Sequence, residues 1–267
     1  MNFKIGISQM KVNSNKEKNL EKVKASLSVF GKNDVNLGVL PECWNCPYGV
    51  EYFEEYSEEI NNSKSIKLMS ELAKENNLYL IGGTIPIKED DKIYNTCFCF
   101  NNKGEIIGKY SKIHLFDIDL GDFSFKESDV LTAGSKPLII ETPYCKIGIG
   151  ICYDLRFPLL ADYYAKNGCN MIVYPGSFSE KTGPIHWSLL LKGRALDNQC
   201  YVIGCSTSKN DDFNYKGYGH SSIVDPWGNI MYEADGDSVC YVRNIDMKYL
   251  EEIRNKIPVL KNTREII

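Results

Sequence analysis

Cys152 stands where a thiol could serve as a nucleophile. It follows an apolar stretch, residues 146–151, and precedes Tyr-Asp-Leu-Arg-Phe-Pro, a pattern that predicts a strand running into a cysteine and then into a helix. Beside a helix N-terminus, free N–H groups and the helix dipole favour a thiolate. A thiolate can attack an electrophilic carbon while neighbouring N–H groups hold the oxyanion. On this segment alone, core packing is the commoner role for a cysteine.

Three charged residues near other predicted strands could complete such a site. Glu42 comes after Val-Leu-Pro, Lys112 begins Lys-Ile-His-Leu-Phe-Asp, and Glu127 follows Phe-Lys. Because α/β sheets bring chemistry to the carboxyl ends of strands, Glu42 and Cys152 hold equivalent places in two similar halves of the chain. Each charged residue alone would more often form an ordinary salt bridge or lie on a solvated face. Together with Cys152, in this order, they favour a catalytic set.

The elements that must position these residues alternate between strand and helix. A capping box at Ser14-Asn-Lys-Glu17 opens a helix whose apolar residues recur at helical spacing, and Asn101-Asn-Lys-Gly104 predicts a hairpin turn. For the first half of the chain we expect strands 3–10, 35–40 and 78–84, a helix from residue 14, a helix over 65–75, and a hairpin of strands 94–100 and 105–110.

The second half repeats this alternation. Short apolar runs are typical of strands buried on both faces, so we expect two mixed sheets packed together with helices outside. No linker or low-complexity tract interrupts the chain, which predicts one domain over residues 1–267. We expect strands 146–151, 170–174 (stopped by Pro175) and 201–206, a hairpin of 221–225 and 229–233, a strand 239–245 that closes this sheet, and helices 159–166, 185–197 and 247–255.

Composition excludes several classes of function. Lys and Arg total 31 and Asp and Glu total 35, and a net charge of −4 does not fit a nucleic-acid-binding surface. No stretch approaches the ~18 apolar residues of a membrane span. The N-terminus, Met-Asn-Phe-Lys-Ile-Gly-Ile-Ser, predicts a first strand and not a signal peptide.

Ten cysteines are present, and without a secretion signal we expect them to be reduced, in a cytoplasmic protein. Most fall in or beside predicted strands, as small core residues do. Cys43 and Cys46 have the CxxC spacing of metal and redox sites. With no second such pair and three histidines in the chain, packing is favoured for them, and we expect no metal.

The chain resembles the nitrilase superfamily of carbon–nitrogen hydrolases over essentially its whole length. The resemblance lies in Leu-Pro-Glu42, Lys112-Ile-His-Leu-Phe and Gly-Ile-Cys152-Tyr-Asp-Leu-Arg-Phe, and in the order and separation of these motifs. It is most similar to Nit-type omega-amidases. A departure occurs at Leu120-Gly-Asp-Phe, where relatives usually carry a proline and a basic residue, and this could alter a pocket lid but not the chemistry. The supporting stretches are 41–49, 112–119, 148–157, 174–178, 182–187 and 219–228.

The resemblance implies a four-layer α-β-β-α sandwich and a catalytic Glu42–Lys112–Cys152 set with Glu127 as a fourth member. Cys152 would attack the amide carbon, and Lys112 would favour the thiolate and stabilise the oxyanion, helped by the backbone N–H of Tyr153. Glu42 would carry the thiol proton to the leaving nitrogen and then activate water against the thioester. Glu127 would orient Lys112 or the substrate nitrogen. The resemblance also implies a homodimer and no cofactor.

An omega-amidase removes the distal amide of a short dicarboxylic acid monoamide, such as 2-oxoglutaramate, 2-oxosuccinamate or succinamate. The carboxylate at the other end needs a cation, and the planar fork of Arg156 could bind it with two bonds. An internal ion pair between Arg156 and Asp154 or a neighbouring residue is an equal alternative. Four aromatic residues at motif positions could wall the pocket, with core packing as the alternative for each: Tyr48, Phe116, Tyr174 and Phe178.

The same residues are compatible with some other functions and argue against others. The same chemistry could act on deaminated glutathione or on an N-carbamoyl compound, because sequence defines pocket shape poorly. A nucleotide-binding oxidoreductase would need Gly-x-Gly-x-x-Gly after a strand, and the stretch from Gly148 to Tyr153 lacks the third glycine. A non-catalytic scaffold is disfavoured because all four polar residues are present. The histidines, His114, His186 and His220, have no catalytic place in the motifs, and the tail over 258–267 could reach a partner chain.

Overall fold

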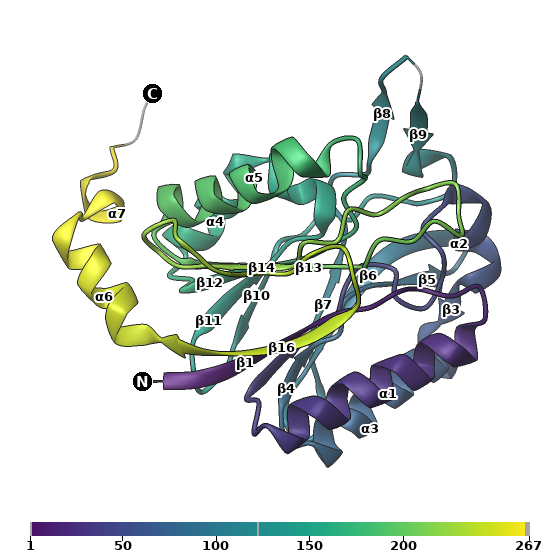
Figure 1. Cartoon of the computed structure of the whole chain (residues 1–267), viewed down its shortest axis with the longest axis horizontal. Coiled ribbons are helices and arrows are strands. Elements are labelled where there is room, and N and C mark those ends of the chain that lie inside the picture. The colour runs from purple at the N-terminus through teal and green to yellow at the C-terminus, as the bar shows by residue number, and fades with distance from the viewer. Residues whose placement is uncertain (1, 122, 265–267) are drawn as a thin grey trace.

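The computed structural model describes residues 2–121 and 123–264, which form two sheets packed face to face with helices outside them (Figure 1). The strands of the first sheet are β1 (Asn2–Gln9), β2 (Leu37–Val39), β3 (Glu58–Glu59), β4 (Tyr79–Ile81), β5 (Ile85–Glu89), β6 (Lys92–Phe100), β7 (Ile106–Ser111) and β16 (Val239–Asp246). They run in the order β16-β1-β2-β4-β6-β5-β3, and β7 pairs with β6. β1, β2 and β4 are parallel neighbours, so their carboxyl ends meet at one edge.

The second sheet contains, in order, β10 (Leu138–Glu141), β11 (Lys146–Ile149), β12 (Met171–Gly176), β13 (Tyr201–Ser206), β14 (Ser222–Val224) and β15 (Ile230–Glu233). Its centre, β11, β12 and β13, is parallel. One hydrophobic cluster draws on both sheets, with Ile5 and Val39 from the first and Ile149 and Val173 from the second. The two inner faces therefore share a core.

Helices cover the outer face of each sheet (Figure 1). α1 (Lys16–Lys32) and α3 (Lys64–Glu75) lie on the first sheet, and α4 (Pro158–Lys166) and α5 (Gly183–Asn198) lie on the second. Val23, Leu27 and Phe30 recur at helical spacing on α1 and are fully buried, which ties this helix to the sheet. The predicted four-layer α-β-β-α sandwich is confirmed.

The cap of α1 differs from the one we expected. The side chain of Asn15, and not that of Ser14, accepts hydrogen bonds from the backbone N–H groups of Glu17 and Lys18. Asparagine is as good an N-cap as serine, and both can stand before the first turn. The capping box at Ser14 was therefore placed one residue too early.

The last strand belongs to the first sheet and not to the second, so the prediction that residues 239–245 close the second sheet was wrong. β16 pairs antiparallel with β1 along eight positions, from Asn2 opposite Asp246 to Gln9 opposite Val239. A local apolar pattern predicts a strand but cannot identify a partner so distant in sequence. The pairing brings the first and the last strand of the described chain together.

Pro175 does not stop the strand before it. β12 continues to Gly176, and Pro175 stands opposite Cys205 in parallel register with β13. The fixed φ of proline is compatible with extended backbone, and only the ladder bond from its nitrogen is lost. The strand therefore reaches the residues that border Cys152.

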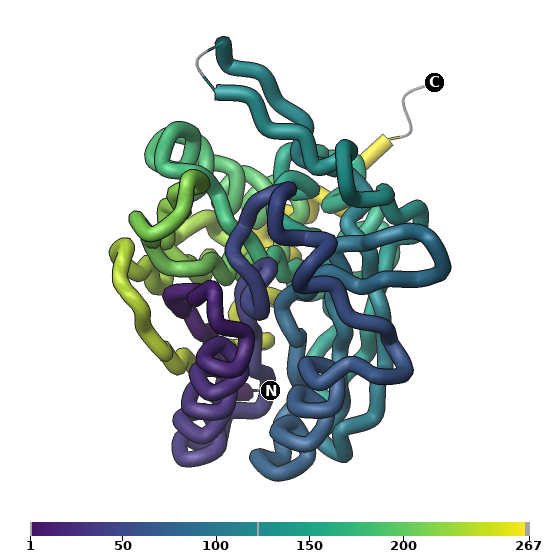
Figure 2. Tube along the Cα trace, turned by 90° about the vertical axis from the view of Figure 1, so that its right-hand side faces the viewer, coloured from purple at the N-terminus to yellow at the C-terminus, as the bar shows by residue number. Residues whose placement is uncertain are grey.

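Several short elements were not among those predicted from the sequence. They include β3, β5 and β10, the helices α2 (Val50–Tyr56), η1 (Ile60–Asn62) and η2 (Glu127–Asp129), and the hairpin of β8 (Asp117–Asp119) and β9 (Ser124–Lys126). The β8–β9 hairpin stands out from the body of the molecule (Figures 1 and 2). Asp122, within the departure at Leu120-Gly-Asp-Phe, lies outside the described residues. No helix in the described ranges is long and apolar enough to cross a bilayer.

The chain after Cys152 forms a short 3-10 helix, η3 (Cys152–Arg156), before α4 begins at Pro158. We expected a helix near residue 159, and α4 agrees with it. The nucleophile candidate itself lies at the start of a single tight turn. At the C-terminus, α6 (Met247–Lys256) and α7 (Val259–Asn262) follow β16, and residues 265–267 of the expected tail lie outside the described residues.

Candidate active site

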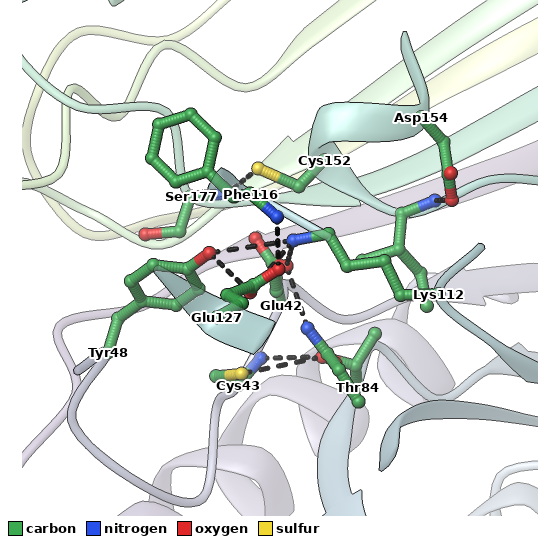
Figure 3. Close-up of polar contacts among 12 residues, drawn as sticks. Glu42, Cys43, Tyr48, Thr84, Lys112, Phe116, Glu127, Cys152, Asp154 and Ser177 are labelled. Carbon is green, nitrogen blue, oxygen red and sulfur yellow. Dashed lines mark hydrogen bonds and ion pairs between the residues drawn. The ribbon is translucent and has the colours of Figure 1, made fainter. Parts of the chain in front are cut away.

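Four predicted catalytic residues converge at the carboxyl ends of the strands (Figure 3). Glu42 follows β2, Lys112 directly follows β7, Cys152 follows β11, and Glu127 opens η2 after β9. The two carboxylates and the lysine are fully buried, and Cys152 is 4% exposed. The strand ends thus bring together side chains from both sheets and from the projecting hairpin.

Lys112 lies between two carboxylates. Its Nζ is 2.9 Å from Oε1 of Glu42 and 2.9 Å from Oε1 of Glu127, and 3.5 Å from the hydroxyl of Tyr48. Burial lowers the pKa of Lys112, but the charges of Glu127 and Glu42 outweigh it, and the net pKa lies well above the usual range. Lys112 therefore remains a cation beside the reacting centre.

Glu42 is held by one of its oxygens. Oε1 accepts hydrogen bonds from Nζ of Lys112 and from Nδ2 of Asn95, each at 2.9 Å. Oε2 is buried and makes no ordinary hydrogen bond within the described residues, so it is free to meet a thiol or substrate proton. Burial raises the pKa of Glu42, Lys112 lowers it, Glu127 raises it, and the balance is a raised pKa. A raised pKa suits a carboxylate that must both take and return a proton.

Glu127 is fixed by three donors. Its Oε1 accepts from Lys112 and from the hydroxyl of Tyr48 at 2.7 Å, and its Oε2 accepts from the backbone N–H of Phe116 at 2.7 Å. Burial and then the charge of Glu127 raise the pKa of Tyr48, so its hydroxyl keeps its proton and donates. Glu127 is held more firmly than Glu42, which fits an orienting role.

Cys152 has a left-handed backbone, with φ of 46°. Such a conformation is strained for a residue with a side chain and persists only where neighbours impose it. Its Sγ accepts a long hydrogen bond from the backbone N–H of Ser177 at 3.5 Å. Burial and the charge of Glu42 raise the pKa of Cys152, and Lys112 and the Ser177 N–H lower it only in part. The resting site therefore favours the thiol, whereas the helix-dipole argument predicted a thiolate.

A small cavity opens beside the thiol. The predicted residues Phe116, Tyr153, Arg156 and Phe178 line it together with Cys152, and three residues that the sequence analysis missed complete the wall: Ser179, Thr182 and Tyr215. Tyr48 lies at the carboxylates instead and stacks on Phe125, with ring centroids 5.5 Å apart. The cavity is thus mostly aromatic, with a few polar groups and one cation.

Tyr174 requires a correction, because it does not line this cavity. Its side chain is fully buried in the core of the second sheet. The ring fills the space beside Gly150, where a Cβ would come within 2.5 Å of it. The side chain of a strand residue can point to either face, and here it points away from the cavity and into the packed interior.

Arg156 does not pair with Asp154. Its Nη1 lies 3.1 Å from Nδ1 of His186, and its guanidinium carbon lies 5.0 Å from the ring centroid of Phe178 and 5.8 Å from that of Tyr153. The side chain is half-buried, at the edge of the cavity. Arg156 forms no ion pair with a carboxylate of the described residues, and a guanidinium that lies on aromatic faces in this way is suited to an anionic ligand.

Two further residues shape the site without any local signal in the sequence. Asn95, on β6, donates to Glu42, and the hydroxyl of Tyr215 donates to the carbonyl of Ser177 at 2.5 Å. Tyr215 also packs on Tyr48, with centroids 4.5 Å apart. Both residues lie outside the motifs, so only the fold could reveal their contacts with the site.

Among the described residues, the other cysteines and the histidines make no hydrogen bond to Glu42, Lys112, Glu127 or Cys152. Cys43 and Cys46 are buried and unbridged. The ring of His220 packs against that of Tyr218 at a tilt of 31°. Among the described residues, no group of three or more His, Cys, Asp or Glu side chains is arranged to hold a metal ion.

The geometry agrees with what comparison with other proteins finds. A model of the family described as carbon-nitrogen hydrolase matches residues 4–255. The chain belongs to this family. Omega-amidase NIT2 of Mus musculus is 46% identical over 98% of this chain and 95% of the mouse protein. Omega-amidase NIT2 of Homo sapiens is 44% identical over the same shares. The crystal structure of Saccharomyces cerevisiae Nit3, a nitrilase superfamily member, is 39% identical, with a TM-score of 0.91 over 99% of this chain and 97% of the yeast chain.

Proposed function

We propose that this protein is an omega-amidase that hydrolyses the distal amide of short dicarboxylic acid monoamides to the acid and ammonia. The observation that carries the proposal is the buried lysine held 2.9 Å from two carboxylates, next to a cysteine at the mouth of a small aromatic cavity. The relatives that bear the omega-amidase name match the chain from end to end. An amide with a second, anionic end fits both the polar cluster and Arg156.

Acylation begins with the resting thiol. As Sγ of Cys152 attacks the amide carbon, Glu42 takes the thiol proton on its free oxygen, and the carbonyl oxygen becomes an oxyanion. Lys112 and the backbone N–H of Tyr153 stabilise that oxyanion. Glu42 then returns the proton to the amide nitrogen as the carbon–nitrogen bond breaks. Ammonia leaves, and a thioester remains on Cys152.

Deacylation uses the same groups in reverse roles. Glu42 takes a proton from a water molecule, and the hydroxide formed attacks the thioester carbon. The carbon–sulfur bond breaks, the sulfur recovers the proton from Glu42, and the acid is released. Glu127 keeps Lys112 in place through both halves, since it shares the ammonium with Glu42.

Arg156 is the group we propose for the free carboxylate of the substrate. It lies at the cavity that holds Cys152, and Ser179 and Thr182 add hydroxyl groups to the same wall. A buried aromatic wall strengthens a guanidinium–carboxylate contact because little water competes for it. Tyr153, Phe116 and Phe178 would enclose the short chain between the two ends of the substrate.

We also propose that two copies pair through α4 and α5. Large apolar side chains on these helices point away from the sheet, and Leu159 is 80% exposed. Contiguous exposed apolar surface of this kind marks interaction sites on soluble proteins. The chain would work in a reducing, cytoplasmic setting, since its cysteines are free. The other exposed apolar residues of this face are Tyr163, Ile185, Leu189 and Leu196.

Ammonia release from a panel of amides tests the activity. The panel contains 2-oxoglutaramate, succinamate, glutamine, deaminated glutathione and an N-carbamoyl amino acid, each with wild type and with Cys152→Ala. Turnover of the first two that the substitution abolishes supports the proposal. Turnover of deaminated glutathione alone would keep the mechanism and overturn the assignment of substrate. Sedimentation of wild type beside Leu189→Asp tests the pairing, and an unchanged dimer would exclude this face.

A further inference from the structure

The carboxylate of Asp154 joins the two chain segments that carry Lys112 and Cys152. Asp154 is fully buried in η3, two residues after the cysteine. It touches neither the cavity nor the ion-paired cluster, and the mechanism above gives it no part. Figure 3 shows it beside Lys112, on the side away from Glu42.

One set of bonds closes the turn around Cys152. Oδ2 of Asp154 accepts a hydrogen bond from the backbone N–H of Ile151 at 2.8 Å, and the backbone N–H of Asp154 donates to the carbonyl of Ile151 at 2.9 Å. These two bonds enclose Cys152, whose φ of 46° is unfavourable for a side-chain-bearing residue. The side chain of Asp154 therefore helps to impose the conformation that aims Sγ.

A second set of bonds reaches the lysine segment. The hydroxyl of Tyr110 donates to Oδ2 of Asp154 at 2.7 Å, and the backbone N–H of His114 donates to Oδ1 at 3.0 Å. Nδ1 of the His114 ring lies 2.6 Å from the same oxygen. Tyr110 and His114 stand two residues before and two residues after Lys112. Both flanks of the lysine are thus fixed to the turn that bears the cysteine.

We infer that Asp154 is a positioning residue that sets the distance and orientation of Lys112 relative to Cys152. A carboxylate suits this task because each oxygen accepts two hydrogen bonds, and four donors converge here. Burial and then the charge of Asp154 raise the pKa of Tyr110, so its hydroxyl stays a donor. The inference rests on the catalytic set given under the proposed function. It assigns to Asp154 the alignment of that set and no contact with substrate.

The test compares Asp154→Asn with a matched control, Asp225→Asn. Asp225 is also a buried aspartate that holds a turn, through the N–H groups of Trp227 and Asn229, but it lies in the β14–β15 hairpin away from the site. Both substitutions keep the shape and remove an acceptor from a network of N–H donors. A purely structural role would lower the melting temperature in both variants and leave kcat alike.

We expect Asp154→Asn to lower kcat on succinamate by roughly 10- to 100-fold with little change in KM, because misplaced reacting groups slow chemistry more than binding. Asp225→Asn should keep kcat within about twofold, since distant sites act independently. A second readout is the rate at which iodoacetamide alkylates Cys152 in the folded protein, followed on its peptide across pH. This rate should fall, or its pH profile shift, in Asp154→Asn only.

Equal kcat and equal alkylation profiles in the two variants would overturn the inference. Tyr110→Phe, which removes one of the four bonds and keeps the ring, covers the case in which Asp154→Asn does not fold. It should lower kcat several-fold without raising KM, and unchanged kcat in this folded variant would also overturn the inference. Alkylation needs no amide substrate, so it tests Asp154 even if wild type releases no ammonia, which would count against the proposed function alone.

Discussion

Two cysteines in this molecule occupy turns of the same kind, and only one lies in a setting for chemistry. Cys43 and Cys152 both follow parallel strands, both are almost fully buried, and both have left-handed backbones, with φ of 45° and 46°. They differ in their neighbours. Cys152 faces a lysine and a backbone donor, whereas Cys43 has Thr84 and Cys46 beside it.

The two thiols differ in the charges and hydrogen-bond donors that act on their pKa values. Burial raises the pKa of both thiols, and around Cys43 the contacts with Cys46 and the charges of Glu42 and Glu127 raise the pKa further. Around Cys152, Lys112 and the N–H of Ser177 act in the opposite direction. Strain and burial occur at both turns, so neither identifies a nucleophile. A nucleophile is identified by a nearby cation and by a base with a free oxygen.

The largest expected effect comes from removing one thiol or the other. Cys152→Ala should abolish ammonia release from succinamate, because Cys152 supplies the thiol among the described residues that line the cavity. Cys43→Ala should keep most of the activity and lose about 1–2 kcal/mol of unfolding free energy to a small cavity. Steady-state kinetics and urea unfolding of both variants measure this. Ammonia release by Cys152→Ala, or loss of ammonia release in a folded Cys43→Ala, would contradict the expected difference between the two cysteines.

Replacing Lys112 by a neutral residue should leave the Cys152 thiol without a nearby cation, which is the situation of Cys43. Lys112→Met should lower kcat by roughly 10²- to 10³-fold, since the oxyanion loses its charged donor. It should also cost about 3–5 kcal/mol of stability, because Glu42 and Glu127 then face each other without a shared counter-charge in a fully buried site. Kinetics and denaturant unfolding test both parts. A variant of wild-type stability would mean that the carboxylates protonate at little cost.

Arg156 should affect binding more than chemistry. Arg156→Met should raise KM for succinamate by roughly 10- to 100-fold, the value of a charged hydrogen-bonded contact, and leave kcat nearly unchanged. A neutral amide of similar length serves as the control substrate, and its KM should not rise. An equal rise for both amides would show that Arg156 supports the cavity wall and does not recognise a carboxylate.

The smallest expected effect is a shift along the pH axis. The pKa of Glu42 is raised chiefly by burial, and kcat/KM should fall as pH falls through that pKa, because the protonated acid cannot take the thiol proton. The charge of Glu127 raises this pKa further, so Glu127→Gln should lower it and move the acid limb to lower pH. The pH profile of both proteins measures the shift. Movement to higher pH would exclude Glu42 as the group that titrates.

The features that could be predicted from the sequence are those that a local residue pattern encodes. The apolar run over Tyr201–Ser206 is a strand with the expected bounds, and the family and sandwich fold are confirmed. Glu42, Lys112 and Cys152 were selected by motif, and the structure places them together, while their catalytic roles stay predictions. Asn95 was missed because it lies 53 residues from Glu42 and reaches it only through sheet pairing. Tyr174 was misplaced because the face to which its side chain points depends on the space beside Gly150, which its ring fills and which no local pattern encodes.

The pairing of the first and last strands has a consequence for the nascent chain during synthesis. β1 is synthesised long before its antiparallel neighbour β16, from which it is separated by more than 200 residues. Until then the edge of the first sheet that carries Ile5 and Ile7 has no partner on that side, and open strand edges recruit other chains. A product terminated before Val239 would keep this edge exposed. Synthesis and docking of β16 is therefore also the step that protects the nascent protein from aggregation through this edge.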